Sequence, residues 1–389
     1  MRTAEVVILG GGVVGASVAW HLAARGCRDV LVCERQADLG RGSTGRATGG
    51  FRAQFGTEIN VRLSLLARRE LQEFRAATGV DPGYDPVGYL FVATSPAQLV
   101  ALREGLQVQR RAGLEEAREV TVEDIRELNP ALCTTDVVGG TFCPTDGFVR
   151  PLDILRGYVE DAARRGVRFE TGCRRAEGLQ DGGSERRVRG VSFRGETVAT
   201  RCVVLAAGAW SGLIGSLAGV YVPVRSERRQ VAVTEPFDAL PARMPMSIDC
   251  TDGFHLRVRD GRVLLLCPNE PEGADPFDIG FDDSWLDGLM ARARHRVPCL
   301  ESAPIDRDAC WAGLYEMSPD RHALVGPVPG VPGLLLATGN SGHGVMHSPA
   351  IGRLVAETIL DGEPRSLDIR ALRPSRFHDG DPNPSSGVI

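Results

Sequence analysis

The opening stretch of the chain limits most strongly what it can fold into. Residues 4–9 form an apolar run long enough for one buried strand, and Gly10-Gly11-Gly12-Val13-Val14-Gly15 follows directly. Residues 16–25 have the composition of a helix, and a second apolar run at 30–33 ends in Glu34. A G-x-G-x-x-G turn is weak evidence alone. Between a strand and a helix, with a terminal carboxylate, it predicts a dinucleotide-binding βαβ unit.

The glycines of this turn have separate physical roles. Gly10 permits the tight turn, Gly12 lets the backbone approach a diphosphate because it has no Cβ, and Gly15 lets the helix pack closely on the strand. The helix that follows presents free N–H groups and a positive dipole end to the phosphates. Glu34 stands where a carboxylate accepts hydrogen bonds from ribose hydroxyls. An acid here argues against a 2′-phosphate and therefore against NADP, whereas FAD and NAD fit this stretch equally.

Composition excludes several other classes of protein. The chain has 389 residues, 43% of them hydrophobic, and a formal net charge of -5, so it is long enough for two cores and gives no reason to expect nucleic-acid binding. No apolar run approaches the roughly 18 residues of a membrane-spanning helix. The first strand begins too early for a signal peptide, so we expect a cytoplasmic protein. The ten cysteines include no C-x-x-C pair and are expected to be reduced, and we predict no metal site.

The chain contains no lysine, so all 45 basic residues are arginines. A Schiff base with pyridoxal phosphate or with a carbonyl substrate is therefore impossible, and so is a Walker A motif. Any cationic binding site must use arginine, which keeps its proton near neutral pH.

Two later strands also run into glycine-rich loops. The run 202–205 leads into a turn of small residues around Gly208, and the run 334–338 leads into the loop 339–344. A third loop of small residues, 40–52, follows Glu34 and could wrap a cofactor. The middle of the chain differs, because residues 254–266 alternate around Asp260-Gly261, the signature of a hairpin with a type I′ turn.

Periodicity and breaker residues predict the remaining elements. The expected helices are 59–77, 96–112 with Ser95 as N-cap, one opened by Thr121 and stopped by Pro130, 152–165, 285–296, and one starting at Ser348-Pro349 and running to about residue 360. The expected strands are 89–94, 228–234, and the pair 167–170 and 188–193, which we assign to an accessory sheet.

These signatures, in this order, resemble the D-amino-acid-oxidase type of FAD-dependent oxidoreductase. The resemblance covers about residues 4–375. Within this type, the chain most resembles the β subunits of heterotetrameric sarcosine oxidase and of dye-linked proline dehydrogenase, and it also resembles glycine oxidase. It implies an α/β (α+β) fold, with a Rossmann-like FAD-binding domain and an antiparallel-sheet substrate domain. The implied FAD-binding domain is discontinuous, at 1–80, 145–220 and 321–378. The substrate domain then spans 81–144 and 221–320, and 379–389 is expected to be a disordered tail.

The resemblance also implies which residues bind FAD. Monomeric sarcosine oxidase tethers its flavin through a cysteine two residues before the tyrosine that matches Tyr315, and Gly313 stands at that position, so we expect FAD to be non-covalent. The implied cofactor-binding residues are Gly10, Gly12, Val13, Val14, Gly15, Glu34, Arg35, Gly42, Ser43, Thr44, Thr48, Gly49, Ala207, Gly208, Trp210, Gly339, Asn340, Gly342, His343 and Gly344.

Four residues are implied on the substrate side. Arg52 matches the family arginine that holds the substrate carboxylate, and Tyr315 and His343 are expected to line the pocket. Arg257 is the nearest match to a lysine that activates oxygen in monomeric sarcosine oxidase, and Met346 replaces a second lysine there. Both replacements weaken a strict oxidase assignment and favour another electron acceptor or a partner subunit.

The implied reaction is oxidation of the C–N bond of a small amino acid or secondary amine that resembles sarcosine, proline or glycine. Hydride passes to flavin N5, and the imine product hydrolyses. One alternative is a 2-hydroxyacid or glycerol-phosphate dehydrogenase on the same fold. An alternative of another class is a non-catalytic flavin-binding assembly factor. The sequence leaves open the exact substrate, the electron acceptor, the need for a partner subunit and the oligomeric state.

Overall fold

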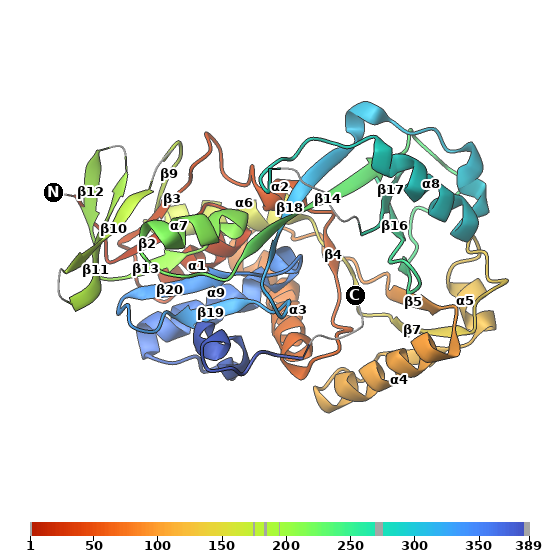
Figure 1. Cartoon of the computed structure of the whole chain (residues 1–389), viewed down its shortest axis with the longest axis horizontal. Coiled ribbons are helices and arrows are strands. Elements are labelled where there is room, and N and C mark those ends of the chain that lie inside the picture. The colour runs from red at the N-terminus through yellow and green to blue at the C-terminus, as the bar shows by residue number, and fades with distance from the viewer. Residues whose placement is uncertain (1, 174–175, 183–184, 194, 269–274, 385–389) are drawn as a thin grey trace.

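The computed structural model describes residues 2–173, 176–182, 185–193, 195–268 and 275–384. Two large sheets organise the chain, one on the left and one on the right of Figure 1. The long strands β14 (Arg225–Val233) and β18 (Trp311–Met317) run between them. This mixed α/β architecture, with a parallel sheet at the N-terminus and a largely antiparallel second sheet, confirms the predicted fold class.

The first sheet has six strands in the order β19-β20-β13-β2-β3-β9. Its strands are parallel except β19, which is antiparallel to β20. The four central strands are buried at every residue, as expected for a parallel sheet that is covered on both faces. The strands are β2 (Val6–Leu9), β3 (Val30–Cys33), β9 (Arg168–Glu170), β13 (Val203–Leu205), β19 (Leu324–Pro327) and β20 (Leu334–Thr338).

Helices cover one face of this sheet, and a smaller sheet covers the other. The helices on the first face are α1 (Val13–Ala24), α3 (Glu58–Thr78), α6 (Pro151–Arg164) and α9 (Gly344–Asp361). The smaller sheet has the order β1-β12-β11-β10, with β1 (Arg2–Thr3), β10 (Ala176–Gly182), β11 (Glu185–Phe193) and β12 (Glu196–Ala199). The helix α7 (Ser211–Leu217) follows β13 through the short turn η1 (Gly208–Trp210).

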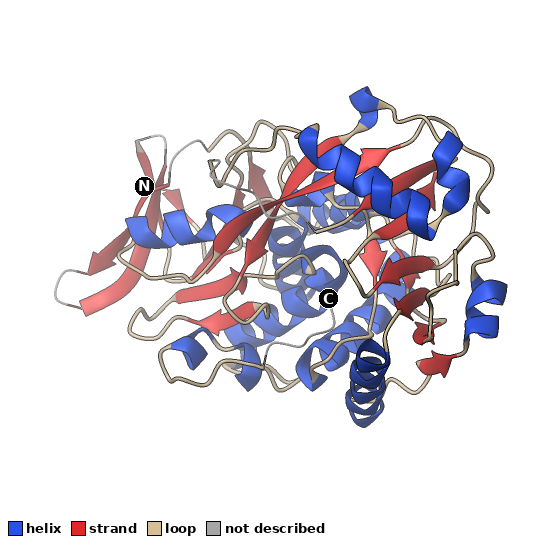
Figure 2. Cartoon of the chain, turned by 45° about the vertical axis from the view of Figure 1, so that its right-hand side comes forward, coloured by secondary structure: helices blue, strands red, loops and turns tan. Residues whose placement is uncertain are grey.

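The second sheet has eight strands in the order β18-β14-β17-β16-β15-β5-β7-β6. The helix α8 (Ser284–Arg296) packs on it, as Figure 2 shows, and α5 (Val122–Leu128) joins the same core. The remaining strands are β5 (Tyr89–Ala93), β6 (Arg118–Val120), β7 (Gly139–Cys143), β15 (Met246–Asp249), β16 (His255–Arg259) and β17 (Arg262–Leu266). The short pair β4 (Gly50–Phe51) and β8 (Gly147–Phe148), with the helix α2 (Ser43–Arg46), lies where the two halves meet.

Local sequence signals are confirmed where they depend on backbone chemistry. The β16–β17 hairpin pairs Arg259 with Arg262, and Asp260 and Gly261 have φ of 52° and 74°, as a type I′ turn requires. The helix α4 (Pro96–Arg111) begins at a capping box in which Ser95 accepts from the Gln98 N–H. All ten cysteines are free thiols. None of the helices in the described residues combines the length and the apolar character that a membrane crossing needs.

Three expectations are corrected. The segment 167–170 does not join the accessory sheet. It forms β9, because α6 brings it back parallel to β3, where Cys33 pairs with Glu170. The expected tail is placed up to residue 384: the Asn383 side chain donates to Asp320 Oδ2 at 3.0 Å and to the Ala371 carbonyl at 2.8 Å. Residues 385–389 lie outside the described chain.

The last helix begins one turn earlier than predicted. α9 starts at Gly344 rather than at Ser348, with Pro349 inside it. Proline removes one N–H from the helix ladder, the one that would reach the carbonyl of Val345. The Ser348 hydroxyl donates to that carbonyl at 2.8 Å instead, so the helix tolerates Pro349. The start of α9 consequently lies at the end of the loop 339–344, and not beyond it.

Candidate active site

A cavity of about 1390 Å³ lies between the two sheets. This volume exceeds the usual 300–1,000 Å³ of a small-molecule site, and a dinucleotide together with a small substrate accounts for it. Its wall includes the carboxyl ends of β2, β3 and β13 and the loop before α9, and continues along β14 and β18. The carboxyl ends of parallel strands are where ligands bind in open α/β sheets.

The glycines at one end of the cavity fall into two groups. At Gly10, with φ of 119°, a Cβ would lie 2.3 Å from the carbonyl oxygen of Ala206, and at Gly15 a Cβ would lie 2.0 Å from the carbonyl oxygen of Gly10. The packing of the protein itself therefore requires both glycines. At Gly12 a Cβ would meet only the Thr44 hydroxyl, at 3.3 Å, and at Gly42 only the Trp210 ring, at 3.8 Å.

Gly12 and Gly42 differ from Gly10 and Gly15, because no neighbouring backbone fills the place of their missing side chains. The space that they leave belongs to the cavity. Both glycines line the cavity, and so does the N-terminus of α1 at Val13 and Val14. The Val13 N–H donates to Thr44 Oγ1 at 3.1 Å, which fixes the loop 40–52 against this helix start. A backbone cradle with a positive helix end is the form of site that holds a diphosphate, so these residues fit the predicted cofactor.

Glu34 is held in place at the end of β3. Its Oε2 accepts from the Gly11 N–H and its Oε1 accepts from the Gln36 N–H, both at 2.8 Å. Beside it, the Arg35 guanidinium lies 4.2 Å from the centre of the Trp210 ring. Trp210 in turn stacks on Phe277, with centroids 5.6 Å apart and planes 13° apart. The sequence predicted Glu34, Arg35 and Trp210 at the cofactor, but Phe277 gave no signal because it lies in an irregular segment.

Most of the predicted cofactor residues line this one cavity. Three of them stand behind its wall instead: Gly15, Gly339 and Asn340. Asn340 acts indirectly, because its Nδ2 donates to Glu316 Oε1 at 2.5 Å. The predicted residues that do line the cavity are Gly10, Gly12, Val13, Val14, Glu34, Arg35, Gly42, Ser43, Thr44, Thr48, Gly49, Ala207, Gly208, Trp210, Gly342, His343 and Gly344.

The other end of the cavity is built from side chains, and Arg52 is central there. Its Nη1 donates to the Gln54 carbonyl at 2.8 Å, its Nη2 lies 3.4 Å from His343 Nε2, and its guanidinium lies 4.2 Å from the Phe55 ring. Arg52 is only 7% exposed, and burial lowers the pKa of its guanidinium. A buried cation in a cavity wall is a suitable partner for a carboxylate.

Behind Arg52, the Asp146 carboxylate is fully buried. It accepts from the Ala53 N–H at 2.7 Å and from Gln54 Nε2 at 3.1 Å, and burial raises its pKa to about 6. Asp146 therefore fixes the backbone on the carboxyl side of Arg52.

His343 is the N-cap residue of α9 and faces Arg52. The pKa of His343 is well below its ordinary value. Burial is the main cause, and the positive charge of Arg52 is the second. His347, one turn further along α9, has a pKa lowered to about 3 for the same reasons and is hydrogen-bonded to the Ser64 hydroxyl at 2.8 Å. Both imidazoles are therefore neutral at pH 7, so the positive charge at this end belongs to arginine.

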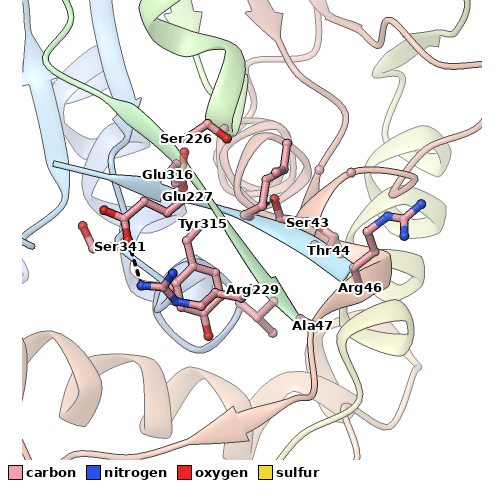
Figure 3. Close-up of a pocket in the computed structure, with 18 of the residues that line it drawn as sticks. Ser43, Thr44, Arg46, Ala47, Ser226, Glu227, Arg229, Tyr315, Glu316 and Ser341 are labelled. Carbon is pink, nitrogen blue, oxygen red and sulfur yellow. Dashed lines mark hydrogen bonds and ion pairs between the residues drawn. The ribbon is translucent and has the colours of Figure 1, made fainter. Parts of the chain in front are cut away.

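Tyr315 lines the cavity between Arg52 and β14. A Cβ at Gly342 would lie 2.5 Å from its ring, so the glycine makes space for the tyrosine. The Arg229 guanidinium lies 5.5 Å from the ring centre and forms an ion pair with Glu227 at 2.7 Å (Figure 3). Sequence reasoning missed Arg229, Glu227 and Glu316, although the two-residue alternation of the paired strands β14 and β18 places side chains of both strands along the cavity.

Arg257 does not line the cavity. Its Nη1 donates to the Thr48 carbonyl, and its guanidinium lies 3.6 Å from the Phe148 ring. Arg257 therefore supports the loop at Thr48 and Gly49 from outside, whereas Arg52 and Arg229 are among the arginines that line the cavity.

The glycine turn, the carboxylate at the end of β3 and the long cavity are the features of a dinucleotide-binding protein whose site extends to a second, largely antiparallel sheet. The family model described as "DAO: FAD dependent oxidoreductase" matches residues 5–358. The chain therefore belongs to the DAO family of FAD-dependent oxidoreductases. FAD is its cofactor, and it is an enzyme of the oxidoreductase class.

Individual relatives agree with this family. The chain is 30% identical to FAD-dependent oxidoreductase domain-containing protein 1 of Xenopus laevis, over 97% of this chain and 83% of that protein. It is 28% identical to human mitochondrial sarcosine dehydrogenase, over 97% of this chain but only 42% of that protein. Among solved structures, L-proline dehydrogenase from P. horikoshii has a TM-score of 0.91 at 27% identity, and covers 98% of this chain and 100% of that one. Glycine oxidase from Geobacillus kaustophilus has a TM-score of 0.83 at 26% identity, over 97% and 99% of the two chains.

Proposed function

We propose that this enzyme oxidises the C–N bond of a small amino acid, preferably a secondary amine of the sarcosine or proline type. The observation that carries the proposal is the buried Arg52 guanidinium in the cavity wall, beside a neutral His343. Relatives whose names include sarcosine, proline and glycine as substrates support the same chemistry.

In this proposal the residues of the chain bind and orient, and FAD, when bound, supplies the two-electron acceptor. Arg52 pairs with the substrate carboxylate and fixes the orientation of the amine-bearing carbon. The buried wall around Phe55 excludes water from that carboxylate pair. No described side chain is required as a strong base, because the amine only has to reach the site without its extra proton.

We further propose that FAD is held without a covalent bond. Gly313 occupies the position of the tethering cysteine, and a Cβ there would lie 3.0 Å from Arg46 Cβ. The thiol nearest to Gly313 in the sequence, Cys310, is not in the cavity wall, and the thiols that do line the cavity belong to other segments: Cys33, Cys173, Cys250 and Cys267. Cys310 is held elsewhere. Its Sγ accepts from the Val233 N–H at 3.3 Å and donates to the Asp306 carbonyl at 3.2 Å. Acid precipitation of the holoenzyme should release all of its flavin into the supernatant, and flavin that stays with the pellet would contradict the proposal.

An electron acceptor other than oxygen is also proposed, since the chain offers Met346 in the cavity wall where an oxidase has lysine. Turnover measured with an artificial dye should be at least tenfold faster than hydrogen peroxide formation in air-saturated buffer. Equal rates would identify an oxidase instead. A requirement for a partner subunit would show as dye reduction that appears only after a second chain is added.

The substrate class is tested by an anaerobic panel in which the flavin absorbance is followed. Bleaching by sarcosine, proline or glycine supports the proposal. Bleaching only by 2-hydroxyacids or glycerol phosphate would support the alternative dehydrogenase. Flavin that no member of a broad panel bleaches would support a binding protein without turnover.

A further inference from the structure

One carboxylate in the cavity wall has no role in the proposed substrate chemistry. Glu316 lies on β18 and lines the cavity. Its Oε2 accepts from Thr338 Oγ1 at 2.7 Å and its Oε1 accepts from Asn340 Nδ2 at 2.5 Å. Burial raises the pKa of this carboxyl, and among the described residues no cation forms an ion pair with it.

The hydrogen bonds of Glu316 and of its neighbour across the sheet bear on what this wall can bind. A carboxylate accepts about four hydrogen bonds. The side chains of Thr338 and Asn340 donate two with good geometry, and the backbone N–H groups of Gly339 and Asn340 also lower the pKa of this carboxyl. Ser226 pairs directly with Glu316 across β14 and β18. The Ser226 hydroxyl oxygen is buried and has no hydrogen-bond partner in the described chain, although the residue lines the same cavity. Figure 3 shows Ser226 and Glu316 next to each other. The Glu316 carboxylate and the Ser226 hydroxyl are therefore neighbouring polar groups in one wall of the cavity.

The position of Glu316 along the cavity indicates which part of the cofactor supplies them. Glu316 Oε2 lies 3.7 Å from where a Cβ of Gly208 would be. Gly208 begins η1, just after β13, and β13 pairs with the strand β2 that leads into the glycine turn. In the other direction, Asn340 accepts from the His343 N–H at 2.9 Å, and His343 faces Arg52. Glu316 thus lies between the diphosphate end and the substrate end.

In FAD, the sugar-alcohol chain connects the diphosphate to the ring. This chain carries hydroxyl groups, which both donate to a carboxylate and accept from a serine. We propose that Glu316 and Ser226 form a subsite that binds hydroxyl groups of the sugar-alcohol chain of FAD. The inference depends on the cofactor and not on the proposed amino-acid oxidation, so its test needs no substrate.

The test is a fluorescence-quenching titration of the apoprotein with FAD and with FAD analogues that lack one hydroxyl of the sugar-alcohol chain at a time. The wild-type chain should bind one analogue about 10- to 100-fold more weakly than FAD, the range for a hydrogen bond to a charged group. Glu316→Gln should weaken FAD itself by a similar factor, and should show less than a threefold difference between FAD and that analogue. Ser226→Ala should weaken FAD about two- to tenfold.

Glu227→Gln is the matched control, because Glu227 is the adjacent carboxylate and is already paired with Arg225 and Arg229. In this variant the ratio of the dissociation constants for the analogue and for FAD should equal the wild-type ratio, even if both constants change. If Glu316→Gln keeps that ratio too, the proposal is wrong. It is also wrong if the loss in Glu316→Gln disappears for FAD methylated at ring N3, because Glu316 would then bind the ring. If Glu316→Gln does not fold, the affinities of wild type and Ser226→Ala for FAD and the analogues test the proposal instead. Equal affinity of the wild-type chain for FAD and for every analogue would contradict the subsite.

Discussion

The two ends of the cavity are built in different ways. The diphosphate end uses backbone: Gly10 and Gly15 are fixed by contacts with neighbouring backbone, and Gly12 leaves room for the ligand. The end that we propose binds the substrate uses side chains from distant segments, since Arg52 follows β4, Tyr315 lies on β18 and His343 precedes α9. The backbone end is centred on one short stretch, residues 10–15, with the Ala206 carbonyl packed against it, whereas the side-chain end takes each of its residues from a different segment. Substitutions at the two ends should therefore affect different quantities.

The largest effect is expected at the backbone end. Gly10→Ala places a methyl group 2.3 Å from the Ala206 carbonyl oxygen at a φ of 119°, so the turn must open and FAD content should fall below a tenth of wild type. Gly26→Ala is the matched control, with φ of 95° but nothing within 4 Å of its Cβ. It should cost about 1 kcal/mol of stability and keep full flavin. The flavin absorbance of each purified variant measures its FAD content. A Gly10→Ala protein with full FAD content would contradict the backbone account.

At the substrate end, Arg52→Ala should leave FAD bound and lower kcat/KM for carboxylate substrates by about 100-fold or more, the cost of losing a buried charge-assisted pair. For an amine without a carboxylate the same variant should lose less than threefold. Steady-state kinetics with N-methylglycine and with a simple secondary amine compare the two. Equal losses for both substrates would show that Arg52 supports the fold and does not bind the carboxylate.

Acid stability should also distinguish the side-chain end. The pKa of His347 is about 3 in the folded chain and near 6.5 when unfolded, so between those values the unfolded chain binds the extra proton. Stability is then fully present above pH 6.5 and falls with decreasing pH, by up to about 1.4 kcal/mol per pH unit for one histidine.

Other buried groups contribute to the same window. His21 also has a pKa of about 3 and acts in the same direction, whereas the raised pKa of Asp146, about 6, acts the opposite way because the folded chain holds that proton. Urea unfolding of wild type and His347→Asn at pH 7 and pH 5 isolates the single histidine. The variant should lose less unfolding free energy than wild type between pH 7 and pH 5. An equal loss in the two proteins would show that His347 does not contribute to the acid sensitivity.

The smallest effect is expected far from both ends. Ser95→Ala removes the capping box of α4 and should lower the free energy of unfolding by about 1 kcal/mol. The FAD dissociation constant and the KM should stay within twofold of wild type. A change in either would show that the α4 region is coupled to the cavity.

The contrast between the ends also explains what could be predicted from the sequence. The turn at residues 10–15, the hairpin at Asp260-Gly261 and the cap at Ser95 depend on backbone chemistry, and the structure confirms these three. Glu34 lies beside the turn, and its contact with the cofactor stays a prediction. Arg52 could be predicted only through the family resemblance. Arg257 was expected near the ligand from its match to a family lysine, but it contacts Thr48 from outside the cavity, because such a match does not tell which face of a strand meets the cavity. Glu316 and Phe277 gave no local signal, since partners from other segments define their positions.

One measurement tests the joint claim that the backbone end holds FAD while Arg52 selects the substrate. It follows the flavin absorbance of wild type and of Arg52→Ala under anaerobic conditions during titration with sarcosine and proline. The account predicts that both proteins carry the same flavin spectrum, and that at least one of the two amino acids bleaches wild type at concentrations that leave Arg52→Ala unchanged. A wild-type chain that binds no flavin, or a variant bleached as readily as wild type, would contradict it.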